Sequence, residues 1–144
     1  MTVTTLEELE QALQTYRGKA VLLNFWAMWC EPCVEELPDL AEVHEAFVEQ
    51  GGVVVGVTYD LMVPGPPAAD VLKRVSVFVD KKGFHFDHYL FDDEDYDRIN
   101  ERLNLPGPVP ITLALDAEGN EVDRQEGQAG RERFEAMMNA ALGR

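Results

Sequence analysis

The sequence of 144 residues predicts an α/β fold in which a mixed β-sheet carries helices on both faces. Two largely apolar runs, at 21–26 and 53–58, have the composition of buried strands. A helical pattern of apolar residues separates them, so the three segments form a βαβ unit with parallel strands. Further along, 111–115 and 121–124 flank a tight turn and predict an antiparallel hairpin. Parallel and antiparallel pairs together make the sheet mixed.

The N-terminal elements follow from capping and spacing signals. Thr5 and Glu8 have the spacing of a capping box, and apolar residues recur at helical intervals after them, which predicts a helix over 5–16. The helix between the two apolar strands carries apolar residues as far as Phe47 and ends at Gly51–Gly52. These elements place a strand-to-helix junction at the chain's cysteines.

The second half of the chain adds a helix and a strand before the hairpin. A proline-rich loop at 64–67 precedes a predicted helix over 68–81 and a short strand over 85–91. Asp93 is predicted to cap another helix, and Gly130 to begin the last one. A chain of this length buries on the order of two thirds of its unfolded surface. We therefore expect a single domain over 1–144.

The charge of the chain excludes some partners. There are 27 acidic and 12 basic residues, which give a formal net charge of −15. Such a surface repels nucleic acid and anionic lipid, so we expect neither as a partner. Solubility accounts for the charge, and docking to a basic partner is the alternative. No segment has the roughly 18 continuous apolar residues of a membrane helix, and we expect a monomer.

The N-terminus lacks the basic start, apolar stretch and cleavage site of a signal peptide. We therefore expect the chain as given to be cytoplasmic. A periplasmic or other extracytoplasmic location applies instead if a leader was removed.

Cys30 and Cys33 are the only cysteines and lie at the predicted start of a helix. A helix N-terminus stabilises a thiolate, so the pKa of Cys30 should be lowered and its sulfur partly exposed. Cys33 lies one helical turn further in and should be more buried. In this arrangement Cys30 attacks a disulfide and Cys33 then resolves the mixed disulfide. Pro32 is tolerated between them because the first helical turn needs no N–H there.

Metal binding is the main alternative for this cysteine pair. A closed zinc site needs four ligands, usually from two cysteine pairs or one pair and two histidines. The chain has no second pair, and its histidines are His44, His85 and His88. We expect no metal and no organic cofactor. The alternative function is a redox-linked chaperone module that handles a metal or haem.

Three motifs resemble the thioredoxin superfamily, and more closely its TlpA/ResA-like branch. The run 24–33 (NFWAMWCEPC) is similar to that branch's active-site strand and motif, and the resemblance covers roughly 18–142. Residues 109–112 (VPIT) resemble its cis-proline loop, and 116–119 (DAEG) the hairpin turn after it. The resemblance implies a thioredoxin-like fold with an inserted helix and strand, and a thiol-disulfide oxidoreductase.

The resemblance also implies roles for individual residues. Cys30 would attack, Cys33 would resolve, and Pro110 would be cis and face them. Trp29 would flank the attacking sulfur, and the Val109 backbone would pair with an extended substrate segment. The substrates would be protein disulfides, and an upstream dithiol protein would donate electrons.

Two departures from classical thioredoxins concern acidic residues. Asn24 stands where those proteins have a buried Asp, and an amide cannot accept the proton of the resolving cysteine. ResA-like proteins have an acidic residue just after the second parallel strand, and Asp60 occupies that position. We predict that Asp60 tunes the pKa of Cys33. The alternative is that Asp60 only forms the turn that ends the strand. Glu31 adds negative charge beside Cys30 and should raise its pKa, which favours a reductase over an oxidant. Glu31 and Pro32 would also contact the substrate.

Overall fold

A six-stranded mixed sheet forms the centre of the computed structural model, which describes residues 1–144. The strand order is β1-β4-β3-β2-β5-β6, with β1 to β4 parallel and the hairpin of β5 and β6 antiparallel. The strands are β1 (Thr2–Thr4), β2 (Ala20–Trp26), β3 (Gly52–Thr58), β4 (Asp87–Phe91), β5 (Ile111–Leu115) and β6 (Glu121–Glu126). The predicted mixed sheet is confirmed.

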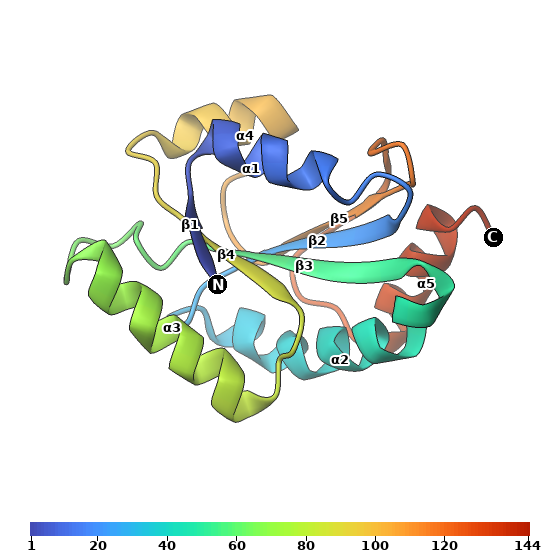
Figure 1. Ribbon diagram of the computed structural model, residues 1–144, viewed down its shortest axis with the longest axis horizontal. Coiled ribbons are helices and arrows are strands. Elements are labelled where there is room, and N and C mark those ends of the chain that lie inside the picture. Colours follow the sequence, from blue (N-terminus) through green and yellow to red (C-terminus); the bar gives the residue numbers. More distant parts are fainter.

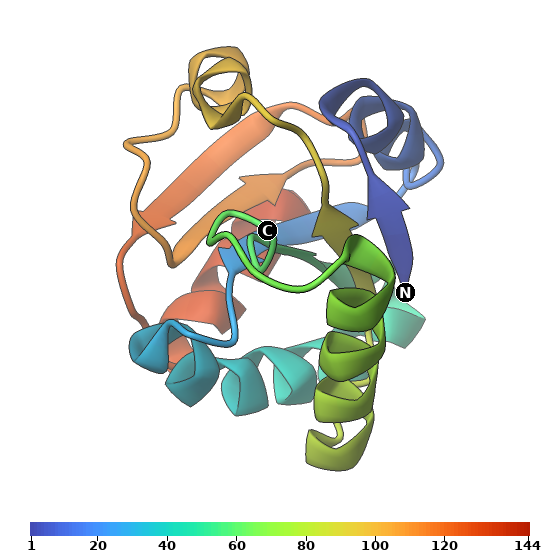
Figure 2. The same ribbon diagram turned by 90° about the vertical axis from the view of Figure 1, so that its left-hand side faces the viewer.

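Helices cover both faces of this sheet. They are α1 (Leu6–Gln14), α2 (Glu31–Phe47), α3 (Ala68–Lys82), α4 (Tyr96–Leu103) and α5 (Arg131–Ala141). Figure 1 shows α1 and α4 above the sheet and α2, α3 and α5 below it, and the turned view in Figure 2 agrees. The predicted α/β layering is therefore confirmed. None of the helices has the length and apolar character needed to cross a membrane.

The two central strands explain why the sheet is stable. Every residue of β2 and β3 is buried, and both are rich in the β-branched and aromatic side chains that pack well on a pleated surface. They pair in parallel from Ala20 opposite Gly52 to Trp26 opposite Thr58. Each large side chain that is fully buried contributes about 1.5–3 kcal/mol. The two apolar strands thus form the buried centre of the sheet that supports the site.

Three chain segments meet at one edge of the sheet. The parallel strands β2 and β3 end there together, and β5 begins there because it runs antiparallel to β2, with Phe25 opposite Ile111. Three loops are therefore neighbours in space: the one after Trp26, the one after Thr58 and the one before Ile111. Sequence motifs far apart in the chain converge at this edge.

Two predicted details differ in the structure. Asp95, and not Asp93, caps α4, because its side chain accepts a hydrogen bond from the Asp97 N–H. Asp93 instead accepts from the Leu6 N–H and forms an ion pair with Arg98, which ties the loop before α4 to α1. The strand β1 was not predicted, since three residues are too few to show a period.

Candidate active site

The two cysteines lie at the N-terminus of α2, where the sequence predicted them. Cys30 is the N-cap residue and Pro32 occupies the first turn. The cysteines form a disulfide with their Cα atoms 5.3 Å apart. Cys30 is 7% exposed and Cys33 is not exposed. The predicted asymmetry is confirmed, although Cys30 is less exposed than expected because the loop before β5 packs over its sulfur.

That loop contains the only cis peptide bond, between Val109 and Pro110. Pro110 is buried, and its carbonyl oxygen accepts from the Gly127 N–H at 2.9 Å. The Val109 carbonyl oxygen lies 3.7 Å from Cys30 Sγ. The cis geometry that the resemblance implied is confirmed. A backbone polar group thus lies directly beside Cys30 Sγ.

The two tryptophans near the pair have different surroundings. Trp26 is fully buried and stacks on Phe78 with ring centroids 6.2 Å apart. Trp29, next to Cys30, is 51% exposed, and Met28 beside it is 36% exposed. Exposed large apolar side chains around a reactive group are typical of an interaction surface. Trp26 is thus a core residue and Trp29 is accessible to a partner.

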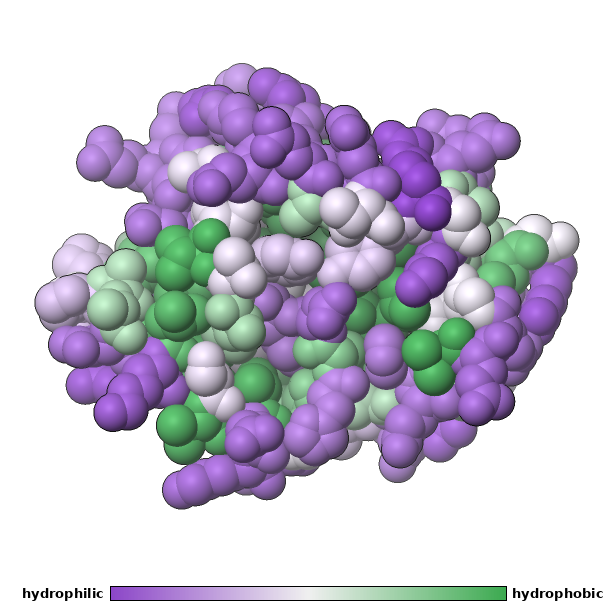
Figure 3. Space-filling view, viewed as in Figure 1, coloured by the Kyte–Doolittle hydropathy of each residue, from purple (hydrophilic) through white to green (hydrophobic).

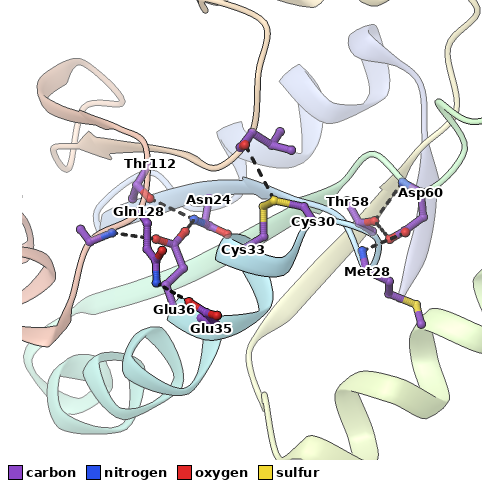
Figure 4. Close-up of a disulfide and its surroundings, with 12 residues drawn as sticks. Asn24, Met28, Cys30, Cys33, Glu35, Glu36, Thr58, Asp60, Thr112 and Gln128 are labelled. Carbon is purple, nitrogen blue, oxygen red and sulfur yellow. Dashed lines mark hydrogen bonds between the residues drawn. A yellow bond between two sulfur atoms is a disulfide. The ribbon is translucent and has the colours of Figure 1, made fainter.

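Glu36 is a buried acid that the sequence analysis missed. It follows Cys33 by three positions on α2, so the two side chains are neighbours on one face of the helix. Its Oε1 accepts from Asn24 Nδ2 at 2.9 Å, and its Oε2 from the Ala129 N–H at 3.1 Å. Asn24 Nδ2 also donates to Thr112 Oγ1 at 2.9 Å. Figure 4 shows this network beside Cys33.

Burial controls the protonation of Glu36. The side chain is 1% exposed, and this loss of solvation raises its pKa to about 7 against the opposing hydrogen bonds from Asn24 and Ala129. A carboxyl group with such a pKa exchanges protons readily at neutral pH. The signal that identifies it in the sequence is its helical spacing from Cys33 on the apolar face of α2.

Asp60 lies on the other side of the disulfide. One carboxylate oxygen accepts from the Met28 N–H at 2.9 Å, and the other accepts from the Thr58 hydroxyl. Burial raises the pKa of Asp60, and these two hydrogen bonds oppose the shift. No hydrogen bond joins Asp60 to either cysteine. Its direct contact is with the loop that leads into Cys30 (Figure 4).

The histidines do not gather into a metal site. No group of three or more His, Cys, Asp or Glu side chains is arranged to hold a metal ion. His44 Nδ1 accepts from the Val54 N–H, and His88 Nε2 lies 3.0 Å from the Phe84 carbonyl oxygen. Both rings therefore have structural partners within the fold.

The fold and the disulfide at the start of α2 define a thioredoxin-like redox domain. The AhpC/TSA family model matches residues 1–125, and the chain belongs to that family. It is 34% identical over 119 residues to the thiol-disulfide oxidoreductase ResA of Geobacillus thermodenitrificans, covering 81% of this chain and 60% of that protein. It is 28% identical over 136 residues to ResA of Bacillus thuringiensis, covering 94% and 71%. The chain thus spans about 60% of the length of the first of these relatives.

Solved structures agree with this assignment. A thiol:disulfide interchange protein of the thioredoxin family from Chlorobium tepidum superimposes with a TM-score of 0.73 at 25% identity. The match covers 90% of this chain and 84% of that one. The predicted thioredoxin-like fold and its TlpA/ResA-like character are therefore confirmed.

Proposed function

We propose that this chain is a thiol-disulfide oxidoreductase that reduces protein disulfides through Cys30 and Cys33. The observation that carries the proposal is the position of Cys30 Sγ, at the N-terminus of α2 and 3.7 Å from the Val109 carbonyl oxygen. The helix terminus stabilises a thiolate at that atom. The curated relatives named thiol-disulfide oxidoreductase ResA support the same chemistry.

The reaction has two exchange steps and transfers two electrons. In the first, the Cys30 thiolate attacks one sulfur of the substrate disulfide, a mixed disulfide forms, and the other substrate sulfur leaves as a thiolate. In the second, the Cys33 thiolate attacks Cys30 Sγ and the remaining substrate sulfur leaves. The substrate is then reduced and the protein holds the Cys30–Cys33 disulfide. An upstream dithiol protein reduces it again by the reverse exchange.

The second step needs a group that takes the proton of Cys33. Asn24 cannot serve, since an amide accepts no proton at neutral pH, and its Nδ2 is a donor to Glu36. Glu36 is suited to the task because burial raises its pKa to about 7, so that its carboxylate can accept a proton at neutral pH. We propose Glu36 as the general base for Cys33, with Asn24 as its positioning residue.

The substrate surface of the proposal surrounds Cys30. Val109 contributes the backbone that pairs with an extended substrate segment, next to cis Pro110. Trp29, Glu31 and Pro32 form the rim, and all three are exposed. This rim offers an aromatic face, a negative charge and a rigid ring to the residues that flank a substrate cysteine.

The direction of exchange is the second part of the proposal. Glu31 lies beside Cys30 in the first turn of α2, and a negative charge there weakens thiolate stabilisation. A less stable thiolate makes the dithiol a better reductant. The reduction potential of the Cys30–Cys33 pair decides whether the protein donates electrons. It has to be compared with the redox potential of the compartment, cytoplasmic or extracytoplasmic.

The chemistry is tested by insulin reduction driven by dithiothreitol. We expect the wild-type protein to reduce insulin and Cys30→Ser to be inactive. Cys33→Ser should accumulate a mixed disulfide with a substrate peptide, which mass spectrometry detects, because the first step proceeds and the second does not. Metal analysis of the purified protein runs in parallel. Stoichiometric metal together with inactive wild-type protein would support the chaperone alternative and overturn the proposal.

A further inference from the structure

One face of α3 and the loop before Cys30 line an open groove of about 630 Å³. Its lining includes Met28, Lys73, Arg74, Val77, Phe78 and Lys81. The members from α3 are three or four positions apart and therefore form a single stripe along that helix. In Figure 3, apolar and hydrophilic side chains are interspersed over the lower left of the molecule, where α3 lies. The groove therefore has both apolar and polar walls.

The charge of the groove is opposite to that of the whole molecule. The net charge is −15, yet Lys73, Arg74 and Lys81 face the groove together with one acid, Asp70. None of these three cations forms a salt bridge. The arginines that do form salt bridges lie elsewhere: Arg98, Arg102, Arg124, Arg131 and Arg133. The cations of the groove are therefore free to meet an anionic partner.

The floor of the groove is apolar and accessible. Val77 is 45% exposed and Met28 36% exposed, and half-buried Phe78 rests on the core through Trp26. A methionine side chain adapts its shape to different apolar partners. A ligand that fits such walls combines acidic groups with an apolar side chain.

The groove begins beside the redox pair. Met28 precedes Cys30 by two residues, so their Cα atoms are at most about 7.6 Å apart. Figure 4 shows the Met28 side chain directed toward α3, and Asp60 fixes the Met28 backbone. The stripe from Asp70 to Lys81 runs for about 16 Å along the helix. An extended segment of about five residues covers that length.

We propose that this groove docks an acidic, apolar segment of the polypeptide whose disulfide exchanges with Cys30. The inference rests on the proposed function and names the class of partner that the site selects. The acidic remainder of the protein does not prevent such docking, because charges further than about 8 Å away are screened at physiological salt. It does disfavour an anionic membrane, which would face the whole acidic surface at once.

Two matched disulfide peptides test the proposal. Each contains one disulfide ring followed by five residues, either Asp-Glu-Leu-Glu-Asp or Lys-Lys-Leu-Lys-Lys. Bis(2-hydroxyethyl) disulfide, which is small and uncharged, reports the thiol chemistry alone. We expect the reduced wild-type protein to react about tenfold faster with the acidic peptide than with the basic one, and added salt to shrink this ratio.

Charge reversal in the groove should remove the preference for the acidic peptide. In Lys73→Glu/Arg74→Glu the acidic peptide should react about tenfold more slowly than with wild type, while the rate with bis(2-hydroxyethyl) disulfide stays unchanged. The control is Arg17→Glu/Lys19→Glu, which changes the net charge equally. Both control residues are exposed and precede β2, at the opposite end of that strand from Cys30. The control should keep the wild-type peptide ratio.

Binding without reaction separates the groove from the chemistry. Peptides with Ser in place of both cysteines cannot exchange, and the exposed Trp29 provides a fluorescence signal for their binding. Tighter binding of the acidic serine peptide to wild type than to the groove variant supports the proposal, even if no disulfide is reduced. Equal binding to both proteins, faster reaction with the basic peptide, or capture of anionic phospholipid vesicles by the groove cations would each overturn it.

Discussion

The two carboxyl groups beside the disulfide differ in their surroundings. Glu36 lies on the Cys33 side, is 1% exposed, and accepts hydrogen bonds from two N–H donors. Asp60 lies on the Cys30 side, is half-buried, and accepts from the Met28 N–H and the Thr58 hydroxyl. Burial raises the pKa of both, and the value for Glu36 reaches about 7. The more deeply buried acid is the one suited to proton transfer.

Position in the fold explains the difference. Glu36 projects from the second turn of α2 toward the central strand β2, where Asn24 donates a hydrogen bond to it. Asp60 follows the end of β3, in a loop at the rim of the sheet. The buried acid of this site lies on helix α2 and accepts a hydrogen bond from Asn24 on β2. Classical thioredoxins instead have an acid at the position of Asn24. The comparison predicts a proton-transfer role for Glu36 and a positioning role for Asp60.

The largest expected effect comes from Glu36→Gln. The variant lacks the proton acceptor for Cys33, so the second exchange step should slow by about 100-fold at pH 7, within the range of general base catalysis. Reaction with 5,5′-dithiobis(2-nitrobenzoate) releases one thionitrobenzoate when Cys30 attacks and a second when Cys33 resolves. Stopped-flow absorbance should show the second release slowed and the first unchanged.

Glu35→Gln is the matched control for this experiment. Glu35 is exposed and lies next to Glu36 on α2, and its substitution by Gln removes the same carboxyl group. Its substitution should leave both releases at wild-type rates. If Glu36→Gln also resolves at the wild-type rate across pH 6–8, Glu36 is not the base.

The same carboxyl group should make stability depend on pH. The pKa of Glu36 is about 7 in the folded protein, compared with 4.5 for a glutamate side chain in the unfolded chain, so folding favours the protonated form. The stabilisation is complete below about pH 4.5 and is lost as pH rises through 7. From 1.36 kcal/mol per pKa unit, the complete loss is on the order of 3 kcal/mol.

Urea unfolding of the oxidised protein at pH 5 and pH 8 measures this loss. Other groups titrate as well, so the informative quantity is the difference between wild type and Glu36→Gln. The variant should lose about 2 kcal/mol less between the two pH values than wild type. Identical pH dependence of the two unfolding free energies would contradict a raised pKa at Glu36.

The sequence predicted the long elements well because their signals are repeated. The apolar runs of β2 and β3 and the capped helix α1 were placed to within two residues, since several residues support each pattern. The short β1 has only three residues and no detectable period. The N-cap of α4 was misplaced among four consecutive acids, because Asp93 and Asp95 are equally good caps by composition.

The residues themselves predicted the site only where its chemistry is local, and the family resemblance supplied the distant cis Pro110. Cys30 and Cys33 share one helical turn at the start of a predicted helix, so their spacing and position together suggested a redox pair. Glu36 was missed because its hydrogen-bond partners come from distant segments: Asn24 is 12 positions away and Ala129 is 93. A buried acid is recognised from such partners, and they meet only in the folded chain.

The smallest expected effect distinguishes two roles of Asp60. Asp60→Asn removes the charge and keeps a carbonyl oxygen that accepts from the Met28 N–H. If Asp60 only positions the loop before Cys30, this variant should retain exchange within about twofold, with unchanged cysteine pKa values. Asp60→Ala removes the acceptor, and loss of one such hydrogen bond costs about 1 kcal/mol, or roughly a fivefold slower first step. A shift in the Cys33 pKa in Asp60→Asn, followed by thiolate absorbance at 240 nm, would instead show that the Asp60 charge tunes Cys33.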